Sequence, residues 1–313
     1  MTAAAVWAVV TSFRPDAGLQ GALDALRGQV DGIIVVDDGS GPEADRILAE
    51  VQTRGARVIR LTRNSGIAVA LNTGIRAALE AGAAAVVTFD QDSVVADGFI
   101  AALLRAGADA RAAGQRPGPV VPEYFADVRQ VHRAAPDGTL IARHAIQSGM
   151  LLERGLLEDV GLMREDLFID LVDTEFELRC ADAARPAIAA PGLTLAHSLG
   201  TQYERRMFGR IVRLPGIPPV VTLSTPFRYY YRVRNRLVVN RAFWRAEFGW
   251  VARDTLLEAI HYVNAWMLAR PRGALWRLYR AAGRDARRGR MGRMPADLVA
   301  VAATISWAAQ RVE

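Results

Sequence analysis

The sequence predicts an α/β protein in which a mostly parallel sheet is flanked by helices and followed by a helical C-terminal appendage. Two observations support this fold class. Short apolar runs alternate with helical patterns through the N-terminal part of the chain, as they do in βαβ units. From about residue 225 the pattern changes to long helical stretches.

The predicted strands are short apolar runs bounded by loop residues, a pattern typical of buried strands. Parallel strands bring their carboxyl ends to one edge of the sheet, so the polar loops after them should converge on one crevice, where open α/β sheets bind ligands. The expected strands are Val6–Thr11, Ile33–Val36, Val58–Leu61 and Ala84–Phe89, and the helices between them are Leu19–Arg27, Glu43–Arg54 and Ile67–Ala81.

The loop after the fourth strand reads Asp90-Gln91-Asp92-Ser93 and is the most informative part of the chain. Two carboxylates one residue apart at a strand end suit a hard divalent cation that takes its remaining ligands from water and a diphosphate. An Asp-x-Asp in a loop is also common as a turn or a helix cap. The other converging loops are therefore needed to support a metal site here.

Composition and charge narrow the function classes. The only cysteine, Cys180, excludes an intrachain disulfide framework and fits a reducing compartment. The net charge is +6 and every basic residue is arginine, which we attribute first to genome composition and second to phosphate recognition. A Rossmann dehydrogenase is not expected, because the first loop, Thr11–Pro15, lacks the Gly-x-Gly-x-x-Gly fingerprint.

A set of motifs occurs in a fixed order along the chain, and its segments are Val9–Pro15, Val35–Ser40, Asn64–Ala68, Asn72–Ile75, Phe89–Ser93, Gln147–Gly149, Phe168–Phe176, Leu178–Arg179, His197–Gly200 and Tyr229–Asn235. In this order they resemble the motifs of glycosyltransferase family 2, and most closely those of bacterial rhamnosyltransferases, whose aspartate motif reads Asp-Gln-Asp-Ser. One departure is Phe13-Arg14, where the family usually has Tyr-Asn or Phe-Asn. The resemblance covers about residues 6 to 240 and implies a GT-A fold.

The resemblance implies a nucleotide-sugar site built from the converging loops. Thr11 and Phe13 would line the nucleobase pocket, and Asp38 or its neighbour Asp37 would accept a hydrogen bond from the base or ribose. For both aspartates a turn before a helix, with Ser40 as N-cap, stays open as an alternative. The other donor-site candidates are Asn64, Gly66, Asp90 and Gln91, of which Gly66 alternatively serves only to turn the chain.

The same resemblance implies a bound Mg²⁺ or Mn²⁺. Asp92 would ligate the ion where it bridges the donor diphosphate, and Asp90 would contact the ribose or the ion, which acts as a Lewis acid. His197 ends the apolar run Leu193–Ala196. Relatives use a histidine at this position as an additional metal or diphosphate ligand.

The second half of the catalytic region is expected to supply the acceptor side. Direct displacement at a sugar carbon needs a carboxylate that takes the proton of the acceptor hydroxyl. Asp173 matches the family's base best, and Asp170 is the alternative. A plain helix N-cap at Asp173, with Glu175 favouring the helix dipole, also stays open. The residues expected in the acceptor floor are Gln147, Ser148 and Gly149.

The segment from Arg270 to Arg293 holds nine arginines and one acidic residue. At about 100° per residue, its apolar side chains fall on one face and its arginines on the other. This pattern predicts an interfacial helix on an anionic membrane surface. The alternative is a helix packed on the catalytic domain with its basic face exposed. Nucleic-acid binding is not expected, because no reader motif accompanies the charge.

Together these readings predict an inverting, metal-dependent glycosyltransferase at the cytoplasmic face of the membrane. The resemblance implies dTDP-L-rhamnose as donor and a lipid-linked or surface polysaccharide as acceptor. A UDP-hexose or UDP-galactofuranose donor, or an inactive sugar-nucleotide- or membrane-binding scaffold, are the alternatives. The expected domains are residues 1–225, with a nucleotide-sugar half to about 115 and an acceptor half from 116, and residues 226–313.

Overall fold

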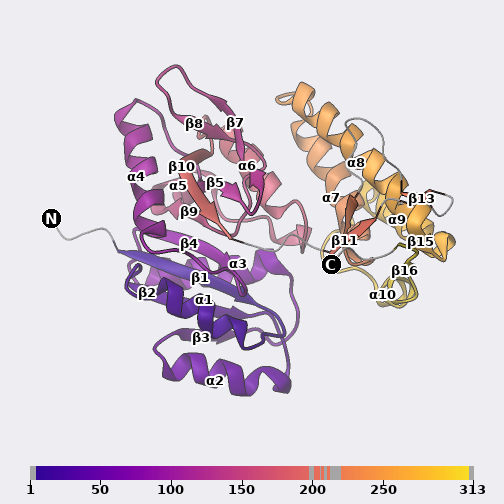
Figure 1. Ribbon diagram of the computed structural model, residues 1–313, viewed down its shortest axis with the longest axis horizontal. Coiled ribbons are helices and arrows are strands. Elements are labelled where there is room, and N and C mark those ends of the chain that lie inside the picture. The colour runs from indigo at the N-terminus through magenta and orange to yellow at the C-terminus, as the bar shows by residue number, and fades with distance from the viewer. Residues whose placement is uncertain (1–4, 197–200, 205, 208–209, 212–219, 310–313) are drawn as a thin grey trace. The chain divides into compact units, whose positions relative to one another are not determined.

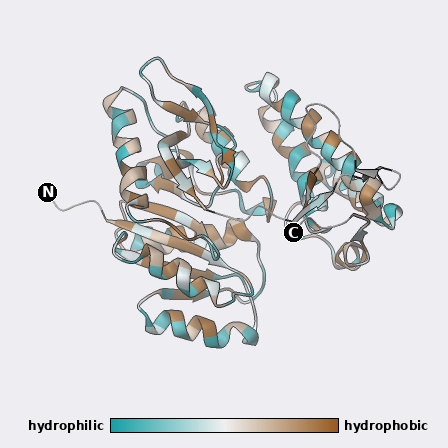
Figure 2. Ribbon diagram, viewed as in Figure 1, coloured by the Kyte–Doolittle hydropathy of each residue, from teal (hydrophilic) through white to brown (hydrophobic). Residues whose placement is uncertain are grey.

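Four parallel strands form one side of a ten-stranded sheet in the computed structural model (Figure 1). Their order is β3-β2-β1-β4, and every paired register among them is parallel. β1 and β4 are buried along nearly their whole length, and Figure 2 colours the strands of this region mostly as hydrophobic. The bounds are β1 Val6–Ser12, β2 Gly32–Asp37, β3 Arg57–Arg60 and β4 Ala85–Asp90, each within one residue of the predicted strand at both ends.

The other strands make the sheet mixed. β9 pairs antiparallel with β4 and with β5, and β5 pairs parallel with β10. β8, β7 and the short β6 complete the sheet. The bounds are β5 Val120–Phe125, β6 Val128–Arg129, β7 Val131–Ala134, β8 Leu140–Ala142, β9 Met150–Glu153 and β10 Ile188–Leu195.

Helices flank this sheet, as predicted. α3 packs on β1, β2 and β4, and α4 packs on β5 and β10. Gly74 lets α3 approach the sheet closely, because a Cβ there would lie 2.3 Å from Val9 Cγ1. The bounds are α1 Gly18–Leu26, η1 Pro42–Ala44, α2 Asp45–Thr53, α3 Ile67–Glu80, α4 Phe99–Ala112, α5 Arg154–Val160, η2 Glu165–Leu167 and α6 Val172–Asp182.

The structure describes residues 5–196, 201–204, 206–207, 210–211 and 220–309. The chain divides into two compact units. Unit 1 comprises Met1–Phe168 and Val172–His197, and unit 2 comprises Ile169–Leu171 and Ser198–Glu313. The three-residue segment Ile169–Leu171 therefore belongs to unit 2, although the chain on both sides of it belongs to unit 1.

Unit 2 is mainly helical. α9 packs on α7, and α8 and α10 pack on α9. Among the described residues, no helix combines the length and the hydropathy that crossing a bilayer requires. The bounds are β11 Thr201–Glu204, β12 Arg206–Met207, β13 Arg210–Ile211, β14 Val220–Leu223, α7 Arg228–Phe243, α8 Phe248–Leu268, β15 Ala269–Arg270, α9 Arg272–Arg287, α10 Ala296–Ala303 and β16 Ser306–Trp307.

Candidate active site

The carboxyl ends of β1, β2 and β4 meet at one edge of the sheet. Because β1 lies between the other two strands, Ser12 stands opposite Asp37 and Thr11 stands opposite Asp90. A pocket of about 320 Å³ opens at this edge. It is lined by Thr11, Ser12, Phe13, Asp38, Ile67, Ala70, Asp90, Gln91 and Asp92.

The two aspartates after β2 have different surroundings. Asp37 is fully buried and accepts hydrogen bonds from the backbone N–H and the hydroxyl of Ser40, so it belongs to the turn. Asp38 lines the pocket and accepts hydrogen bonds from the backbone N–H groups of Ser65 (2.6 Å) and Gly66 (2.9 Å). The alternative in which Ser40 is the N-cap does not hold, since Gly41 precedes the helical turn and Ser40 is bonded to Asp37.

Asp38 thereby fixes the loop that leads into α3. Gly66 has φ of 95°, and a Cβ there would lie 2.5 Å from the Phe168 carbonyl oxygen. Both the backbone conformation and this close approach require glycine. Asn64 and Gly66 are not part of the pocket lining, although the Asn64 Oδ1 atom is buried without a hydrogen-bond partner among the described residues.

The loop after β1 is tied to the loop after β4. The backbone N–H of Phe13 donates to Gln91 Oε1 at 2.9 Å. The Arg14 backbone N–H donates to Ser40 Oγ at 2.7 Å, and its guanidinium lies 5.2 Å from the centre of the Phe13 ring. Arg14, the departure from the family pattern, therefore covers the half-exposed Phe13 at the rim of the pocket.

Asp90 is hydrogen-bonded to the segment Gln147–Gly149, which was expected to form the acceptor floor. Gln147 Nε2 donates to Asp90 Oδ1 at 2.6 Å, and the Asp90 backbone N–H donates to Ser148 Oγ at 3.1 Å. Ser148 also bonds Ser93 Oγ, and the Gly149 N–H donates to the Thr88 carbonyl. These residues do not line the pocket at the strand ends, so their observed contact is with the carboxylate loop.

The pocket fits a divalent cation that completes its ligand shell with a diphosphate. Asp90 and Asp92 both line this cavity, and carboxylate oxygens are the ligands that Mg²⁺ and Mn²⁺ prefer. Ser12 Oγ is buried in the pocket wall without a partner in the described chain, which suits a bound polar group. Within the described residues, no group of three or more His, Cys, Asp or Glu side chains could hold an ion unaided.

His197 lies outside the described residues. The described chain before it ends at Ala196, which pairs with Val94, two residues beyond Asp92.

Asp173 is the second residue of α6 and is not an N-cap, because the helix begins at Val172. Its Oδ1 atom accepts a hydrogen bond from the Thr174 N–H at 2.8 Å. Glu175 forms a two-pronged ion pair with Arg179, at 3.2 and 3.0 Å. The contact of Glu175 is thus one turn along its own helix.

Glu177 was not anticipated from the sequence. Burial raises the pKa of Glu177 to about 7, and the nearby Asp173 carboxylate adds to this effect, while the Ala145 N–H and Arg143 oppose it. The Glu177 carboxylate accepts a hydrogen bond from the Ala145 N–H at 2.9 Å and lies 3.5 Å from Arg143. Glu177 thus links the helix of Asp173 to the segment before Gln147.

Asp170, in unit 2, is engaged by an arginine. Arg228 contacts both of its carboxylate oxygens, with the shortest distance 2.6 Å. Asn235 Nδ2 donates to the carbonyl oxygens of Ile169 and Asp170, each at 2.8 Å. Phe168, Asp170 and Leu171 all have positive φ, between 61° and 69°, a conformation that is unfavourable for residues with a Cβ. The two α7 side chains therefore clamp a strained segment.

Comparisons with known proteins agree with this geometry. The family model for glycosyl transferase family 2 matches residues 7–149. The dTDP-rhamnosyl transferase RfbF of Shigella flexneri is 30% identical over 248 residues, covering 75% of this chain and 80% of that protein.

Two solved structures share the fold at low identity. GalNAc-T7, solved with UDP, GalNAc and Mn²⁺, has a TM-score of 0.55 and 15% identity, covering 78% of this chain and 48% of that one. S. aureus TarS 1-349 with UDP-GlcNAc has a TM-score of 0.50 and 12% identity, covering 91% and 92%. The chain spans 39% of the longer S. aureus TarS chain.

GalNAc-T7 supports the GT-A-like α/β architecture, and the relationship to RfbF extends over most of both proteins. The chain belongs to glycosyltransferase family 2.

Proposed function

We propose that this glycosyltransferase transfers L-rhamnose from dTDP-L-rhamnose, with inversion, to a lipid-linked or surface polysaccharide at the cytoplasmic face of the membrane. The observation that carries the proposal is the pocket at the strand ends, which is lined by Asp90 and Asp92 together with Thr11, Phe13 and Asp38. The relationship to a dTDP-rhamnosyl transferase supports the choice of donor.

In this proposal the pocket holds the nucleoside diphosphate. Phe13 stacks on or beside the base, and Asp38 accepts a hydrogen bond from the base or ribose. Asp90 and Asp92 hold Mg²⁺ or Mn²⁺, which when bound neutralises charge on the departing diphosphate. We assign this donor half to about residues 1–115 and the acceptor half to 116–225.

We assign the general base to Asp173. It stands in the first turn of α6, whereas Asp170 is already occupied by the Arg228 guanidinium. A base must take the acceptor proton as the glycosidic bond forms, and a carboxylate bound on both oxygens is poorly placed to accept it.

The test is calorimetry of the full chain with dTDP-L-rhamnose, UDP-glucose, UDP-galactofuranose and UDP-GlcNAc, each with Mg²⁺ or Mn²⁺. We expect the dTDP sugar to bind most tightly, with affinity lost on chelation and in Asp92→Asn. Asp97→Asn, an exposed aspartate outside the pocket, is the matched control. Tighter binding of a UDP sugar would show that the donor is not a dTDP sugar. Donor binding that does not depend on Mg²⁺ or Mn²⁺ would contradict the proposed metal site. Donor binding without turnover on any lipid-linked glycan would favour the scaffold alternative.

A further inference from the structure

The acidic side chains of α8 face the rest of unit 2, and many of its apolar side chains face solvent. This is the reverse of an ordinary surface helix. Its acidic residues face α7, where Glu258 forms a two-pronged ion pair with Arg232 at 2.7 and 2.9 Å, and Asp254 pairs with Arg236. All four side chains of these pairs are at most 20% exposed. The charged groups of α8 are thus mostly withdrawn from solvent.

The outer face of α8 is apolar. Leu256, Ile260 and Val263 are 63%, 51% and 56% exposed, at the spacing of one helix face. Arg253 is the exposed charged residue on this helix. Contiguous exposed apolar surfaces of this kind mark sites of interaction. The other large exposed apolar residues of α8 are Phe248, Leu257, Trp266 and Met267.

This apolar surface continues into a pocket between α8 and α9. The pocket has a volume of about 490 Å³, and Trp266 and Trp276 contribute a ring from each helix. Tryptophan favours the boundary between hydrocarbon and water, because its ring is apolar and its N–H is polar. The remaining lining residues are Ala259, Tyr262, Val263, Gly273 and Tyr279.

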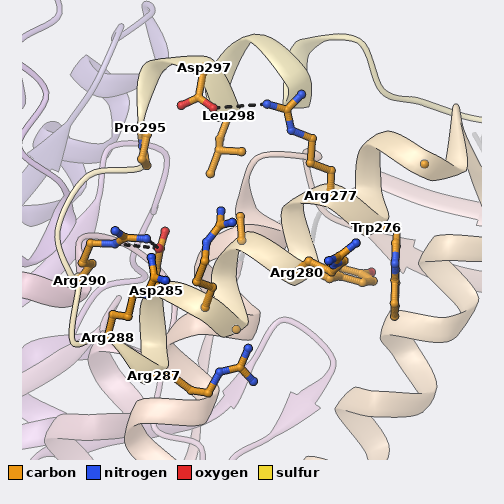
Figure 3. Close-up of a pocket in the computed structure, with 15 residues that line it drawn as sticks. Trp276, Arg277, Arg280, Asp285, Arg287, Arg288, Arg290, Pro295, Asp297 and Leu298 are labelled. Carbon is orange, nitrogen blue, oxygen red and sulfur yellow. Dashed lines mark hydrogen bonds and ion pairs between the residues drawn. The ribbon is translucent and has the colours of Figure 1, made fainter.

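A second, arginine-lined pocket of about 1250 Å³ adjoins the first and shares Trp276 with it (Figure 3). The two acidic residues of its lining are each paired, Asp297 with Arg277 and Asp285 with Arg290. Arg280, Arg287 and Arg288 are exposed and form no ion pair with the described part of the chain. The positive charge here is therefore available to an anionic partner.

The net positive charge of the chain comes from residues 220–309. Residues 220–309 contain sixteen arginines and five acidic residues, whereas the net charge of the complete chain is only +6. The rest of the chain is therefore acidic in sum.

The sequence pattern of α9 predicted that its apolar face enters a membrane, and the structure contradicts this prediction. Leu275, Leu278 and Ala282 are buried within unit 2, because α9 packs on α7. The amphipathic pattern is present, but its apolar side is already used. The arginines of α9 remain outside and lie next to the apolar surface that α8 supplies.

We propose that the outer face of α8 and the arginine-lined pocket of α9 together dock on an anionic lipid bilayer. The apolar residues would enter the interface, the two tryptophans would lie at its boundary, and the arginines would meet lipid phosphates. A symmetric second copy fits less well, because it would bring arginine against arginine. The inference rests on the membrane location proposed above, and not on the identity of the donor.

The test is sedimentation of the full chain with vesicles of phosphatidylcholine alone or mixed with phosphatidylglycerol, at low and high salt. We expect binding to the anionic vesicles that weakens with salt. Changing Arg280, Arg287 and Arg288 together to Gln should lower the partition coefficient by about 100-fold, since each arginine near such a surface contributes about fivefold. Changing Ile260 and Val263 together to Ser should lower it by about tenfold.

Matched controls are the exposed arginines Arg57, Arg105 and Arg133 changed to Gln, and the exposed Val128 changed to Ser, all in unit 1. These should bind vesicles as the unchanged chain does, and calorimetry should give the same donor affinity for every variant. Equal binding to neutral and anionic vesicles, or none to either, would overturn the proposal. So would a stable dimer in analytical ultracentrifugation that ignores vesicles and dissociates on the α8 changes.

Discussion

At the scale of single residues, the carboxylate loop is positioned by side chains that do not line its pocket. Gln147 and Ser148 together hold the side chain and the backbone of Asp90. Their types suit this work, because an amide donates to a carboxylate and a hydroxyl accepts from a backbone N–H. The position of Asp90 is thus set before any ligand arrives.

Changing Gln147 to Ala should weaken donor binding by about 10- to 100-fold. The reason is the loss of a hydrogen bond to a charged group, which is worth about 1.5 to 3 kcal/mol. Calorimetry with the nucleotide and Mg²⁺ would measure it. Gln115→Ala, which removes an exposed amide that contacts Asp137, should leave the affinity unchanged. Equal affinity in both variants would mean that Asp90 needs no support.

Glu177 should make the folded state less stable as the pH rises. Burial raises the pKa of Glu177 from 4.5 to about 7, so the folded state holds a proton that the unfolded state has released between these values. This contribution is fully present below pH 4.5 and is lost as the pH rises through about 7. Denaturant unfolding from pH 5 to 8 should show the decline.

Glu177→Gln should flatten that decline. At pH 8 its free energy of unfolding should exceed that of the unchanged chain by up to about 3 kcal/mol. The amide oxygen can still accept the Ala145 N–H. Glu158→Gln is the control on an exposed carboxylate. A parallel decline in Glu177→Gln and the unchanged chain would assign the pH dependence to another group.

Asp173→Asn should separate donor binding from turnover. A positioned base acts in the transition state and contributes about 10² to 10⁴ in rate, with little effect on donor affinity. Single-turnover transfer would measure the first and calorimetry the second. Asp170→Asn is the comparison, since the two residues compete for the role. Full loss in Asp170→Asn with an active Asp173→Asn would move the base to Asp170.

At the scale of elements, α7 acts as a clamp on the segment before α6. Arg228 and Asn235 lie seven residues apart on α7 and reach the same short segment, Ile169–Leu171. Positive φ values in that segment cost of the order of 1 to 2 kcal/mol each, so outside contacts must hold it. The Tyr-Arg-Val-Arg-Asn stretch thereby gains a structural role.

Asn235→Ala should lower the free energy of unfolding by about 1 to 3 kcal/mol, because it leaves two carbonyl oxygens without their donor. It should also lower turnover more than donor affinity, since Asp173 follows the clamped segment by two residues. Chemical unfolding and steady-state kinetics would measure the two effects. Asn240→Ala, on the same helix and bonded to Thr255, is the control for stability alone. Unchanged kinetics in Asn235→Ala would confine the clamp to folding.

Elements with a local pattern were predictable from the sequence, and long-range contacts were not. β1, β2 and β4 are continuous apolar runs that end in polar residues, so their bounds and their shared edge followed directly. The role of Asn72, which bonds Met163 and Glu165, left no local signal beyond the motif that contains it.

The sequence also did not predict which face of α8 is exposed, or that Glu177 is buried. Leu256, Ile260 and Val263 have the spacing of a core-facing helix, yet they are exposed, because Asp254 and Glu258 turn toward the arginines of α7. Only the partners in space decide which face of such a helix is the inner one.

At the scale of the whole molecule, two compact units divide the work in our proposals: unit 1 contains the nucleotide pocket, and unit 2 contains the basic, apolar surface. Binding to the native state alone stabilises whatever unfolds with the site. Calorimetric scans should therefore show a transition that rises with nucleotide and Mg²⁺ and another that does not. A hundredfold excess over the dissociation constant should add about 2.7 kcal/mol to the first.

Asp92→Asn should abolish this shift and leave the second transition unchanged. One cooperative transition that moves as a whole would instead mean that the units unfold together.

Because Ile169–Leu171 belongs to unit 2, a shortened chain that lacks the helices of unit 2 would also affect the segment before α6. A catalytic fragment ending near residue 225 would follow the domain boundary expected from the sequence, yet it would discard Arg228 and Asn235. The Asp170 carboxylate would lose its counter-charge, and the turn before α6 would lose the side chains that hold it. Such a fragment should still bind nucleotide and fail to transfer sugar, and that failure would be mistaken for a missing acceptor.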